Sequence, residues 1–480
     1  MSLRRLTAVV CLVVEATGVA MLSASLLGVI YREWADAGKI AVAAAAVILV
    51  GEGLRRLLGA RGLLTVKEGF AVIGISWIAM TLAGTIPYLV TGSLHTFGDA
   101  VFEASSGFST TGASVVADPA ALSHAVLWWR ALSQWLGGFG VIVIAVAIVP
   151  MLGLSGLGVV GTESAAGERR PPRVRVVAKR LLLLYVGLTA AAAALLVFSD
   201  MTLFEAVANA FTTMSTGGFV TRAGSMGAFN TYAQSVTFVV MVIAGTSFAL
   251  HASALRTPGR YLRNIEFRAY VMVLTASALV LAVGLWADGI WRAIRLGGYT
   301  AVSIVTTTGF TVDDPAGWSP GLQMLIVALM FVGGMAGSAA GGIKTIRLAA
   351  VTNAARIDLR RMIHPLAVLR TRFGGDAMEP EVVSGARTFT LFYLLSFLAG
   401  TLILGIIGSG SAPGDDLLSS ASIAASALGN VGPGLGAVGG SGGYTALPEA
   451  GRWVLSGLMI VGRLEIFPIA LLFTRGLWRR

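Results

Sequence analysis

The chain has 480 residues, of which 56% are hydrophobic and only 12% carry a formal charge. A soluble domain usually carries about 25% charged residues, so this composition excludes an ordinary water-soluble fold. The net charge is +11, but the basic residues fall between apolar segments and form no single face or arm, which argues against nucleic acid as a partner. The sequence therefore predicts an all-α polytopic membrane protein.

Cysteine and histidine usage argues against catalysis. The single cysteine, Cys11, lies inside an apolar segment and leaves no disulfide framework. The four histidines show no pair at metal-ligand spacing: His95, His124, His251 and His364. An integral-membrane transferase or protease would need a nucleophile, a base or metal ligands that converge. We therefore expect that the protein is not an enzyme.

Ten segments are apolar enough to be membrane spans, each near the roughly 20 residues that a bilayer requires. In chain order they are 8–30, 40–58, 70–90, 125–151, 181–198, 236–250, 270–285, 321–336, 389–407 and 453–473. The first is too long for a signal peptide and has no clear cleavage site, so we interpret it as a retained helix. Basic clusters alternate with the spans at 55–67, 169–180, 256–268, 344–372 and 475–480. By the positive-inside rule, these loops and both termini are predicted to be cytoplasmic.

The opposite connections carry acidic residues instead, among them Asp99, Asp200 and Asp416. One interpretation is an acidic vestibule that collects cations near a pore mouth. The other is that these three residues are N-caps of short helices. The sequence leaves both interpretations open.

A pattern recurs in four of these outer connections. Each runs through a short apolar stretch of about three helical turns and ends in small hydroxyl or amide residues before a glycine. The copies read STTGA from Ser109, MSTGG from Met214, TTTGF from Thr306 and GNVGP from Gly429. Four copies between pairs of spans make an internal repeat. We expect four helix–pore loop–helix repeats around a central pore, plus two N-terminal helices: 1–62 for the N-terminal pair, then 63–160, 161–262, 263–375 and 376–480.

The repeated loop suits a cation. Irregular backbone at membrane depth is tolerated only where it is buried in protein or lines a water-filled cavity. A short helix that ends at the loop directs its partial negative charge inward, and loop carbonyls can replace the water around a dehydrated cation. Glycine permits close approach and positive φ. Any one of the 61 glycines could equally serve helix packing, but recurrence at four equivalent places favours an ion filter.

The third repeat contains a glycine-rich interruption from Gly333 to Lys344. Small residues at this density unwind a helix in mid-membrane. Its position on the cytoplasmic side of the filter predicts a gate made by Gly334, Gly337, Ser338, Gly341, Gly342 and Lys344. The alternative is a helical packing face of small residues spaced four apart, with Gly333, Gly337 and Gly341.

The last apolar segment contains two ionisable residues, Arg463 and Glu465. Arg463 precedes Arg475 by twelve positions, which places it about 18 Å from the helix end. A charge at this depth faces the bundle interior or a wet cavity. We expect Arg463 to be an electrostatic barrier or tether below the filter, with a structural ion pair as the alternative, and Glu465 to be a structural partner on a different face.

Five motifs together resemble the superfamily of potassium transporters that includes Trk, Ktr and HKT proteins, and the TrkH-type membrane subunit most closely. They are FEASSGFSTTGAS from Phe102, TTTGF from Thr306, MAGSAAGGIKTIR from Met335, GNVGPGLG from Gly429 and GRLEIFP from Gly462. The resemblance covers almost the whole chain. Two departures stand out: the fourth repeat has Asn430-Val431 where the others have hydroxyl residues, and the third-repeat loop is rich in alanine.

The resemblance implies a pore for K⁺ and Rb⁺ in the cytoplasmic (inner) membrane, closed by the Gly333 to Gly342 loop with Arg463 facing it. It implies a homodimer in membrane lipid and a cytosolic TrkA-type nucleotide-binding regulatory protein. A Na⁺- or H⁺-coupled symporter is the alternative, although no clear inverted repeat is visible. The implied filter glycines are Gly112, Gly217, Gly309 and Gly432, with backbone oxygens from Thr110, Thr111, Ser215, Thr216, Thr307, Thr308, Asn430 and Val431.

Overall fold

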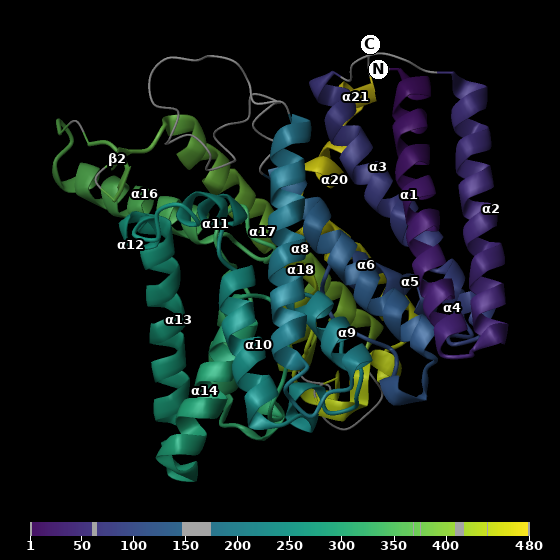
Figure 1. Ribbon diagram of the computed structural model, residues 1–480. Helices are drawn as coiled ribbons and strands as arrows, with labels where there is room; N and C mark the ends of the chain where they lie inside the picture. Colours follow the sequence, from purple (N-terminus) through teal and green to yellow (C-terminus); the bar gives the residue numbers. More distant parts are fainter. Residues whose placement is uncertain are drawn as a thin grey trace.

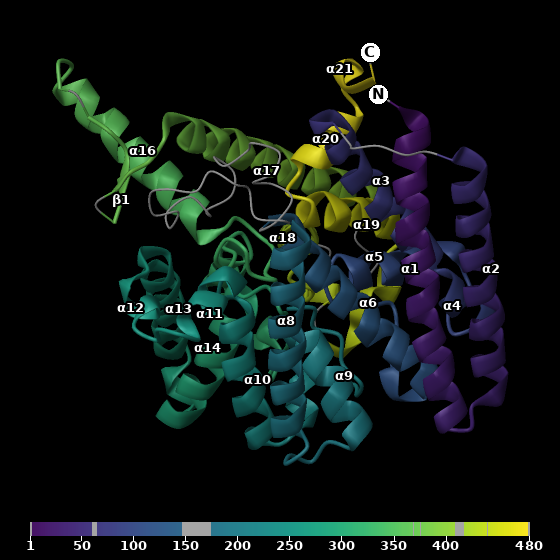
Figure 2. The same ribbon diagram turned by 45° about the horizontal axis from the view of Figure 1, so that its top comes forward.

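The computed structural model describes residues 2–59, 65–145, 174–367, 369–374, 376–408, 417–438 and 440–478. This part of the chain is helical apart from short connections and one small antiparallel hairpin, β1 (Arg372–Phe373) with β2 (Asp376–Ala377). The all-α membrane fold predicted from composition is confirmed. Both chain ends lie at the same end of the molecule (Figures 1 and 2), where Leu477 packs against Leu6 and Val10.

Two N-terminal helices, α1 (Leu3–Ile30) and α2 (Trp34–Leu58), form an antiparallel pair at one edge of the molecule (Figure 1). Their short connection lets small residues meet: the Ser25 hydroxyl donates to the Ala37 carbonyl at 2.8 Å. The pair precedes the repeats, as the sequence predicts, and packs against the first of them, where the Glu33 carboxylate accepts from the His124 backbone amide at 2.8 Å.

The four repeats follow in chain order. Each contains a long first helix, a short re-entrant helix, a loop and a second helix. The first two comprise α3 (Val66–Gly84), α4 (Ile86–Thr91), α5 (Phe97–Phe108) and α6 (His124–Val143), then α8 (Val174–Leu196), α9 (Leu203–Met214), α10 (Thr231–Ala244), α11 (Phe248–Ala254) and α12 (Arg260–Arg263). The last two comprise α13 (Ile265–Gly284), α14 (Ile290–Val305), α15 (Pro320–Leu329) and α16 (Thr345–Ile363), then α17 (Pro380–Ile407), α18 (Leu417–Gly429), α19 (Glu449–Arg463), α20 (Phe467–Leu472) and α21 (Arg475–Trp478).

Long, unbroken apolar helices are fewer among the described residues than the ten spans predicted. Among the described residues, six helices are long and apolar enough to span, and a seventh is possible if the bent pair α10 and α11 counts as one span. Three of the second helices are bent or short: α10 meets α11 at 96°, α15 has 10 residues and α19 has 15. Hydropathy does not reveal the break between α10 and α11, because the residues on both sides of it are apolar, whereas the glycine-rich interruption after α15 was predicted.

Local chemistry explains one of these breaks. After α19, Ile466 adopts φ of 65°, and Pro468 follows at the start of α20. A β-branched residue at positive φ interrupts the helix, and proline cannot donate a backbone hydrogen bond to continue it. The sequence GRLEIFP therefore ends one helix and starts another at a new angle.

Glycines bring the second helices into contact with the ends of the re-entrant helices. A Cβ atom added at Gly462 of α19 would lie 1.9 Å from the Leu428 carbonyl oxygen of α18. The equivalent atom at Gly137 of α6 would lie 2.1 Å from the Phe108 carbonyl oxygen of α5. Small residues allow helix backbones to approach this closely, so glycine fixes where each re-entrant helix ends.

The N-cap interpretation of the acidic residues is wrong for two of the three. The side chains of Thr96 and Thr202 cap α5 and α9. Asp99 pairs with Arg452 of α19 at 2.6 Å, and Asp200 accepts from the Asn230 amide at 3.1 Å. Each threonine is the N-cap because its hydroxyl accepts a hydrogen bond from the backbone amide three residues later, at Asp99 or Glu205.

Several sequence predictions fall outside the described residues. Asp416 is one, as are the basic residues 169–173 and the residues on both sides of the 62/63 and 160/161 repeat boundaries. The repeat boundaries themselves stay predictions.

The Gly462 contact gives a stability prediction. Gly462→Ala forces a methyl group against the Leu428 carbonyl and should lower the free energy of unfolding by about 1–3 kcal/mol. Gly457 lies on the same helix with no atom within 4 Å of an added Cβ, so Gly457→Ala should be neutral or stabilising by less than about 1 kcal/mol. Thermal unfolding of both variants in detergent checks this; equal midpoints would contradict it.

Candidate functional site

The four loops share one unusual backbone conformation. A non-glycine residue at positive φ is uncommon, yet each loop has one, two positions before a glycine that is also at positive φ. The pairs are Thr110 (53°) and Gly112 (85°), Thr216 (53°) and Gly218 (78°), Thr307 (56°) and Gly309 (76°), and Asn430 (55°) and Gly432 (111°). The four loops are therefore structural repeats and not only sequence repeats.

This geometry shifts the second repeat by one residue relative to the sequence alignment. Gly218, and not Gly217, has the backbone of Gly112. The Gly217 amide donates to the Thr212 carbonyl at 2.7 Å, as the Thr111 amide does to the Ser106 carbonyl at 2.9 Å. Gly217 thus occupies the position of Thr111. The sequence could not settle this register because two glycines stand side by side.

The loops meet in a closed ring. An added Cβ at Gly112 would lie 2.3 Å from the Gly217 carbonyl oxygen, and one at Gly218 would lie 2.0 Å from the Thr308 carbonyl oxygen. An added Cβ at Gly309 would lie 1.8 Å from the Val431 carbonyl oxygen. The fourth contact, from Gly432 to the Thr111 carbonyl oxygen at 2.4 Å, closes the circle. We call the carbonyls of Thr111, Gly217, Thr308 and Val431 the carbonyl ring.

The filter residues predicted from the sequence lie at this ring or within two positions of it, and all are buried except Gly112 and Gly309, which are partly exposed. Hydroxyl pairs stiffen two of the loops: Ser109 with Thr111 at 2.6 Å and Thr306 with Thr308 at 2.8 Å. In the fourth loop, the Asn430 side-chain amide donates to the Thr111 hydroxyl at 3.1 Å. The fourth repeat thus joins the others although it lacks hydroxyl residues.

Gln134 of α6 is a site residue that sequence reasoning missed. Its side-chain amide donates to the Gly217 carbonyl at 2.6 Å, and its side-chain oxygen accepts from the Phe219 amide at 3.1 Å. Both groups of this buried amide are therefore paired, as burial requires. The available signal was a polar residue within a predicted membrane span, where Arg130 and Ser133 are polar as well.

A buried ion pair supports the first two loops and was also missed. The Arg130 guanidinium donates to the Glu103 carboxylate at 2.8 Å and lies 4.1 Å from the Phe219 ring centroid. Glu103 further accepts from the Ser114 hydroxyl at 2.9 Å and the Val115 amide at 3.1 Å. Both side chains are almost fully buried, at 2% and 0% exposure. The pair fixes the outer side of the ring, because a buried charge must keep its partner.

The glycine-rich segment between α15 and α16 is an irregular loop, so the helical packing-face interpretation is wrong. A backbone bridge between Val332 and Ile343 joins the two ends of this segment, and the Gly333 amide donates to the Ile343 carbonyl at 2.9 Å. Gly337 and Gly342 adopt φ of 74° and 64°. Glycine is needed at these two positions because other residues are strained there.

This glycine-rich loop contacts the residues that precede the carbonyl ring in the other loops. The Thr216 hydroxyl donates to the Ala339 carbonyl at 3.0 Å, and the Gly341 amide donates to the Thr307 hydroxyl at 2.7 Å. An added Cβ at Gly341 would lie 2.4 Å from the Gly429 carbonyl oxygen. The loop therefore packs against repeats two, three and four at the residues that precede the ring.

Other predicted gating residues also hold the loop in place. The Ser338 hydroxyl donates to the Met335 carbonyl at 2.7 Å, and the Lys344 ammonium donates to the Ala340 carbonyl. The Thr345 amide donates to the Gly334 carbonyl at 3.1 Å. These bonds lie within the segment and its junction with α16.

Arg463 contacts the same loop from α19. Its guanidinium donates to the Ala339 carbonyl at 2.7 Å and to the Gly137 carbonyl at 3.2 Å. Within the described ranges no acidic side chain lies within 4.0 Å of it, which excludes the structural ion pair there. Glu465 pairs with Arg347 instead, at 2.6 Å, as expected of a structural residue. Two main-chain carbonyls therefore hold the Arg463 charge.

The ring, the loop and the arginine can be compared with known proteins. The profile of TrkH, described as "Cation transport protein", matches residues 38–287 and 290–478. The chain belongs to the TrkH family. It is accordingly a multi-pass membrane protein of cation transport, in agreement with its apolar helices.

Relatives in several bacteria support this membership. The chain is 35% identical over 430 residues to the Trk system potassium uptake protein TrkH of Escherichia coli K12, covering 87% of both chains. It is 34% identical over 493 residues to the protein of the same name from Salmonella typhimurium, covering 100% of both. The crystal structure of the potassium transporter TrkH from Vibrio parahaemolyticus matches with a TM-score of 0.89 at 32% identity, again over 100% of both.

The buried ion pair leads to a prediction with a matched control. Arg130→Ala leaves the Glu103 charge buried without a partner and should cost about 3–5 kcal/mol of stability. Arg222 also pairs with a glutamate and stacks on a phenylalanine, at 2.5 Å from Glu205 and 4.5 Å from the Phe229 ring centroid, but it is 34% exposed. Arg222→Ala should therefore cost about 1 kcal/mol or less. Thermal unfolding in detergent compares the two, and similar losses would refute the argument.

Proposed function

We propose that this protein takes up K⁺ across the cytoplasmic membrane through a single pore that the carbonyl ring encircles. The observation that carries this proposal is the closed contact of four loops, each repeat offering one carbonyl and one positive-φ glycine to its neighbour. Relatives at 34–35% identity are named Trk system potassium uptake proteins. K⁺ is here the transported substrate.

Backbone carbonyls serve this purpose because they replace the water of a dehydrating ion without adding net charge. In the proposed filter, the ring oxygens come from Thr111, Gly217, Thr308 and Val431. The residues before them, at Thr110, Thr216, Thr307 and Asn430, would supply the next layer toward the cytoplasm. Ser215, which the sequence places among the ligands, corresponds to Ser109 at the end of the preceding helix and lies one position further from the ring.

We further propose that the loop from Gly333 to Lys344 is the gate. It packs against residues that precede the ring in three repeats, and its own hydrogen bonds involve backbone groups that a moved loop would have to pair elsewhere. Arg463 would hold the loop through Ala339 and add a positive barrier to cations. Release of this contact would open the path.

The remaining proposals concern assembly. We propose a homodimer that acts with a cytosolic TrkA-type nucleotide-binding protein, with both chain ends in the cytoplasm and repeats as predicted in the sequence. The basic residues of α16, including Arg356, Arg360 and Arg361, lie in a helix that extends away from the bundle (Figure 2), which suits contact with a partner.

Cation flux into liposomes comparing K⁺, Rb⁺, Na⁺ and Li⁺ tests the main proposal, the pore that the carbonyl ring encircles. Flux that does not discriminate among these ions would overturn it.

Filter glycines should be sensitive to added side chains. Gly112→Ser and Gly218→Ser each place a side chain against a ring carbonyl and require a strained backbone, so both should reduce the preference for K⁺ over Na⁺. Gly187→Ser on α8 is the control, because no atom lies within 4 Å of an added Cβ there. The readout is the ratio of K⁺ to Na⁺ flux in liposomes. An unchanged ratio in folded Gly112 and Gly218 variants would remove both from the filter.

The gate proposal is tested at Arg463. Arg463→Gln keeps a polar side chain but removes the charge and weakens the bond to Ala339, so K⁺ flux without any partner should rise about tenfold. Arg475→Gln, at the exposed end of α21, is the matched control and should leave flux unchanged. Lower flux from a folded Arg463 variant would assign this residue to filter support and not to closure.

A further inference from the structure

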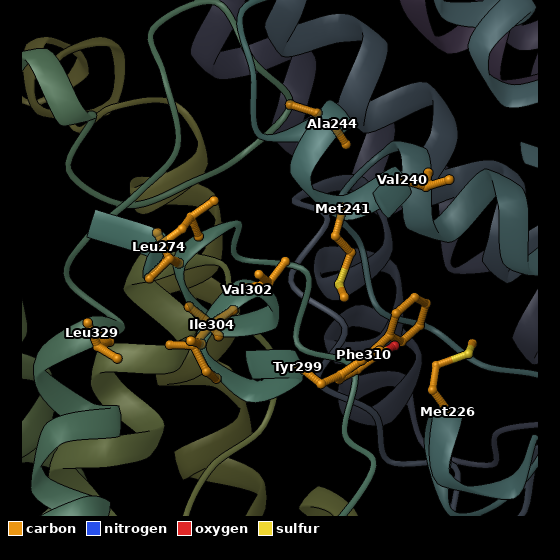
Figure 3. Close-up of a cluster of buried hydrophobic side chains, with 14 of the residues drawn as sticks. Met226, Val240, Met241, Ala244, Leu274, Tyr299, Val302, Ile304, Phe310 and Leu329 are labelled. Carbon is orange, nitrogen blue, oxygen red and sulfur yellow. The ribbon is translucent and has the colours of Figure 1, made fainter. Parts of the chain in front are cut away.

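A groove of about 610 Å³ lies between α10, α13 and α14, outside the carbonyl ring. Its wall is mostly apolar and includes Phe238, Val242, Leu274, Ala278, Tyr299 and Val302. Three of these residues, Leu274, Tyr299 and Val302, are labelled in Figure 3. The rim residues Val239, Leu279 and Ile294 are more than half exposed, so the groove opens on the outer surface of the helix bundle. Its size falls within the range of about 300–1,000 Å³ that is usual for ligand sites.

Two tryptophans locate this groove relative to the membrane. Trp286 and Trp291 stand at the turn from α13 to α14 and are 76% and 82% exposed. Exposed tryptophans are enriched at the membrane–water interface. The groove runs along Val271 to Ala282 of α13, which is long and apolar enough to span the bilayer. Its mouth therefore lies at the interface and its body at the depth of lipid tails.

An unpaired arginine stands at the mouth. Arg295 lines the groove one helical turn beyond Trp291 and is exposed. In the described part of the chain it has no hydrogen-bond partner and no carboxylate within 4.0 Å, whereas its neighbour Arg292 has the Asp313 carboxylate at 4.0 Å. A cation at this depth is expected to pair with an anion. A phosphate is a suitable anion, because the arginine guanidinium binds phosphate oxygens through two parallel hydrogen bonds.

We propose that this groove binds an anionic phospholipid, with one acyl chain along α13 and α14 and the phosphate on Arg295. The apolar wall matches the chain, the interfacial tryptophans match the glycerol level, and the free guanidinium matches the phosphate. The site is distinct from the ion path and does not depend on its assignment.

The proposed lipid would contact the helix that ends at the third filter loop. Val302 lies one turn before Thr306, and the Tyr299 hydroxyl pairs with the Thr237 hydroxyl of α10 at 2.9 Å. An acyl chain in the groove would therefore contact the residues that pack α10 against α14. It would stiffen the re-entrant helix from the lipid side.

Native mass spectrometry of the full chain tests this site. The protein is reconstituted in vesicles of phosphatidylglycerol and phosphatidylcholine in equal parts, extracted in mild detergent and weighed with its retained lipid. We expect wild type to retain phosphatidylglycerol preferentially. Arg295→Gln should lower that preference about tenfold, as for loss of one charge-assisted hydrogen bond, whereas the control Arg292→Gln should keep it.

A second variant blocks the groove itself. An added Cβ at Gly298 meets no atom within 4 Å, so Gly298→Leu should fold, fill the groove and lower retention of both lipids. Undiminished phosphatidylglycerol preference in Arg295→Gln would overturn the proposal, whether or not Gly298→Leu folds. A change of oligomeric state in Gly298→Leu with lipid retention unaltered would also overturn it, since the groove would then be covered by a second copy of the chain.

Discussion

The fold depends on a contact between main-chain atoms: the carbonyl of one loop against the glycine of the next. An added methyl group would lie 1.8–2.4 Å from a carbonyl oxygen at each of the four contacts, so no side chain fits there. Each contact fixes two repeats relative to one another, and the fourth leaves no free edge. The re-entrant helices, the broken second helices and the Arg130–Glu103 pair are arranged around this requirement, because each of them positions a loop backbone.

The same requirement explains why the glycine-rich loop can reach the centre of the molecule. Gly333 and Gly341 leave room for close passage, since an added Cβ on Gly333 would lie 2.0 Å from the Gly341 carbonyl oxygen. The loop fills the volume behind the ring with backbone and with the buried side chains of Met335, Ala339 and Ala340. Its polar groups pair with Thr216, Thr307 and Arg463. Movement of the loop would break these hydrogen bonds and uncover its buried apolar side chains, so new contacts would have to replace both.

Much of this arrangement was legible in the sequence. Recurrence of small polar residues before glycine predicted the four loops, and an arginine within an apolar segment predicted a residue aimed into the bundle. The glycine-rich interruption after α15 was predicted as well, but the break after α10 was less visible, since apolar residues continue on both sides. The register of Gly217 and Gly218 needed φ angles. Gln134 and the Glu103–Arg130 pair needed contacts between segments 27 to 83 residues apart, which one sequence does not specify.

The four repeats, or quarters, belong to one polypeptide, and this determines how an inserted segment can be accommodated near the axis. In an assembly of four identical subunits, any inserted segment would appear four times, and four such segments could not share the narrow space on the axis. Within the described ranges, only the third quarter carries the insertion. The Thr216 hydroxyl donates to it, the Thr307 hydroxyl accepts from it, and Asn430 lies beside its Gly341. Covalent linkage of the quarters thus permits an inserted segment in a single copy, with different contacts to each of its neighbours.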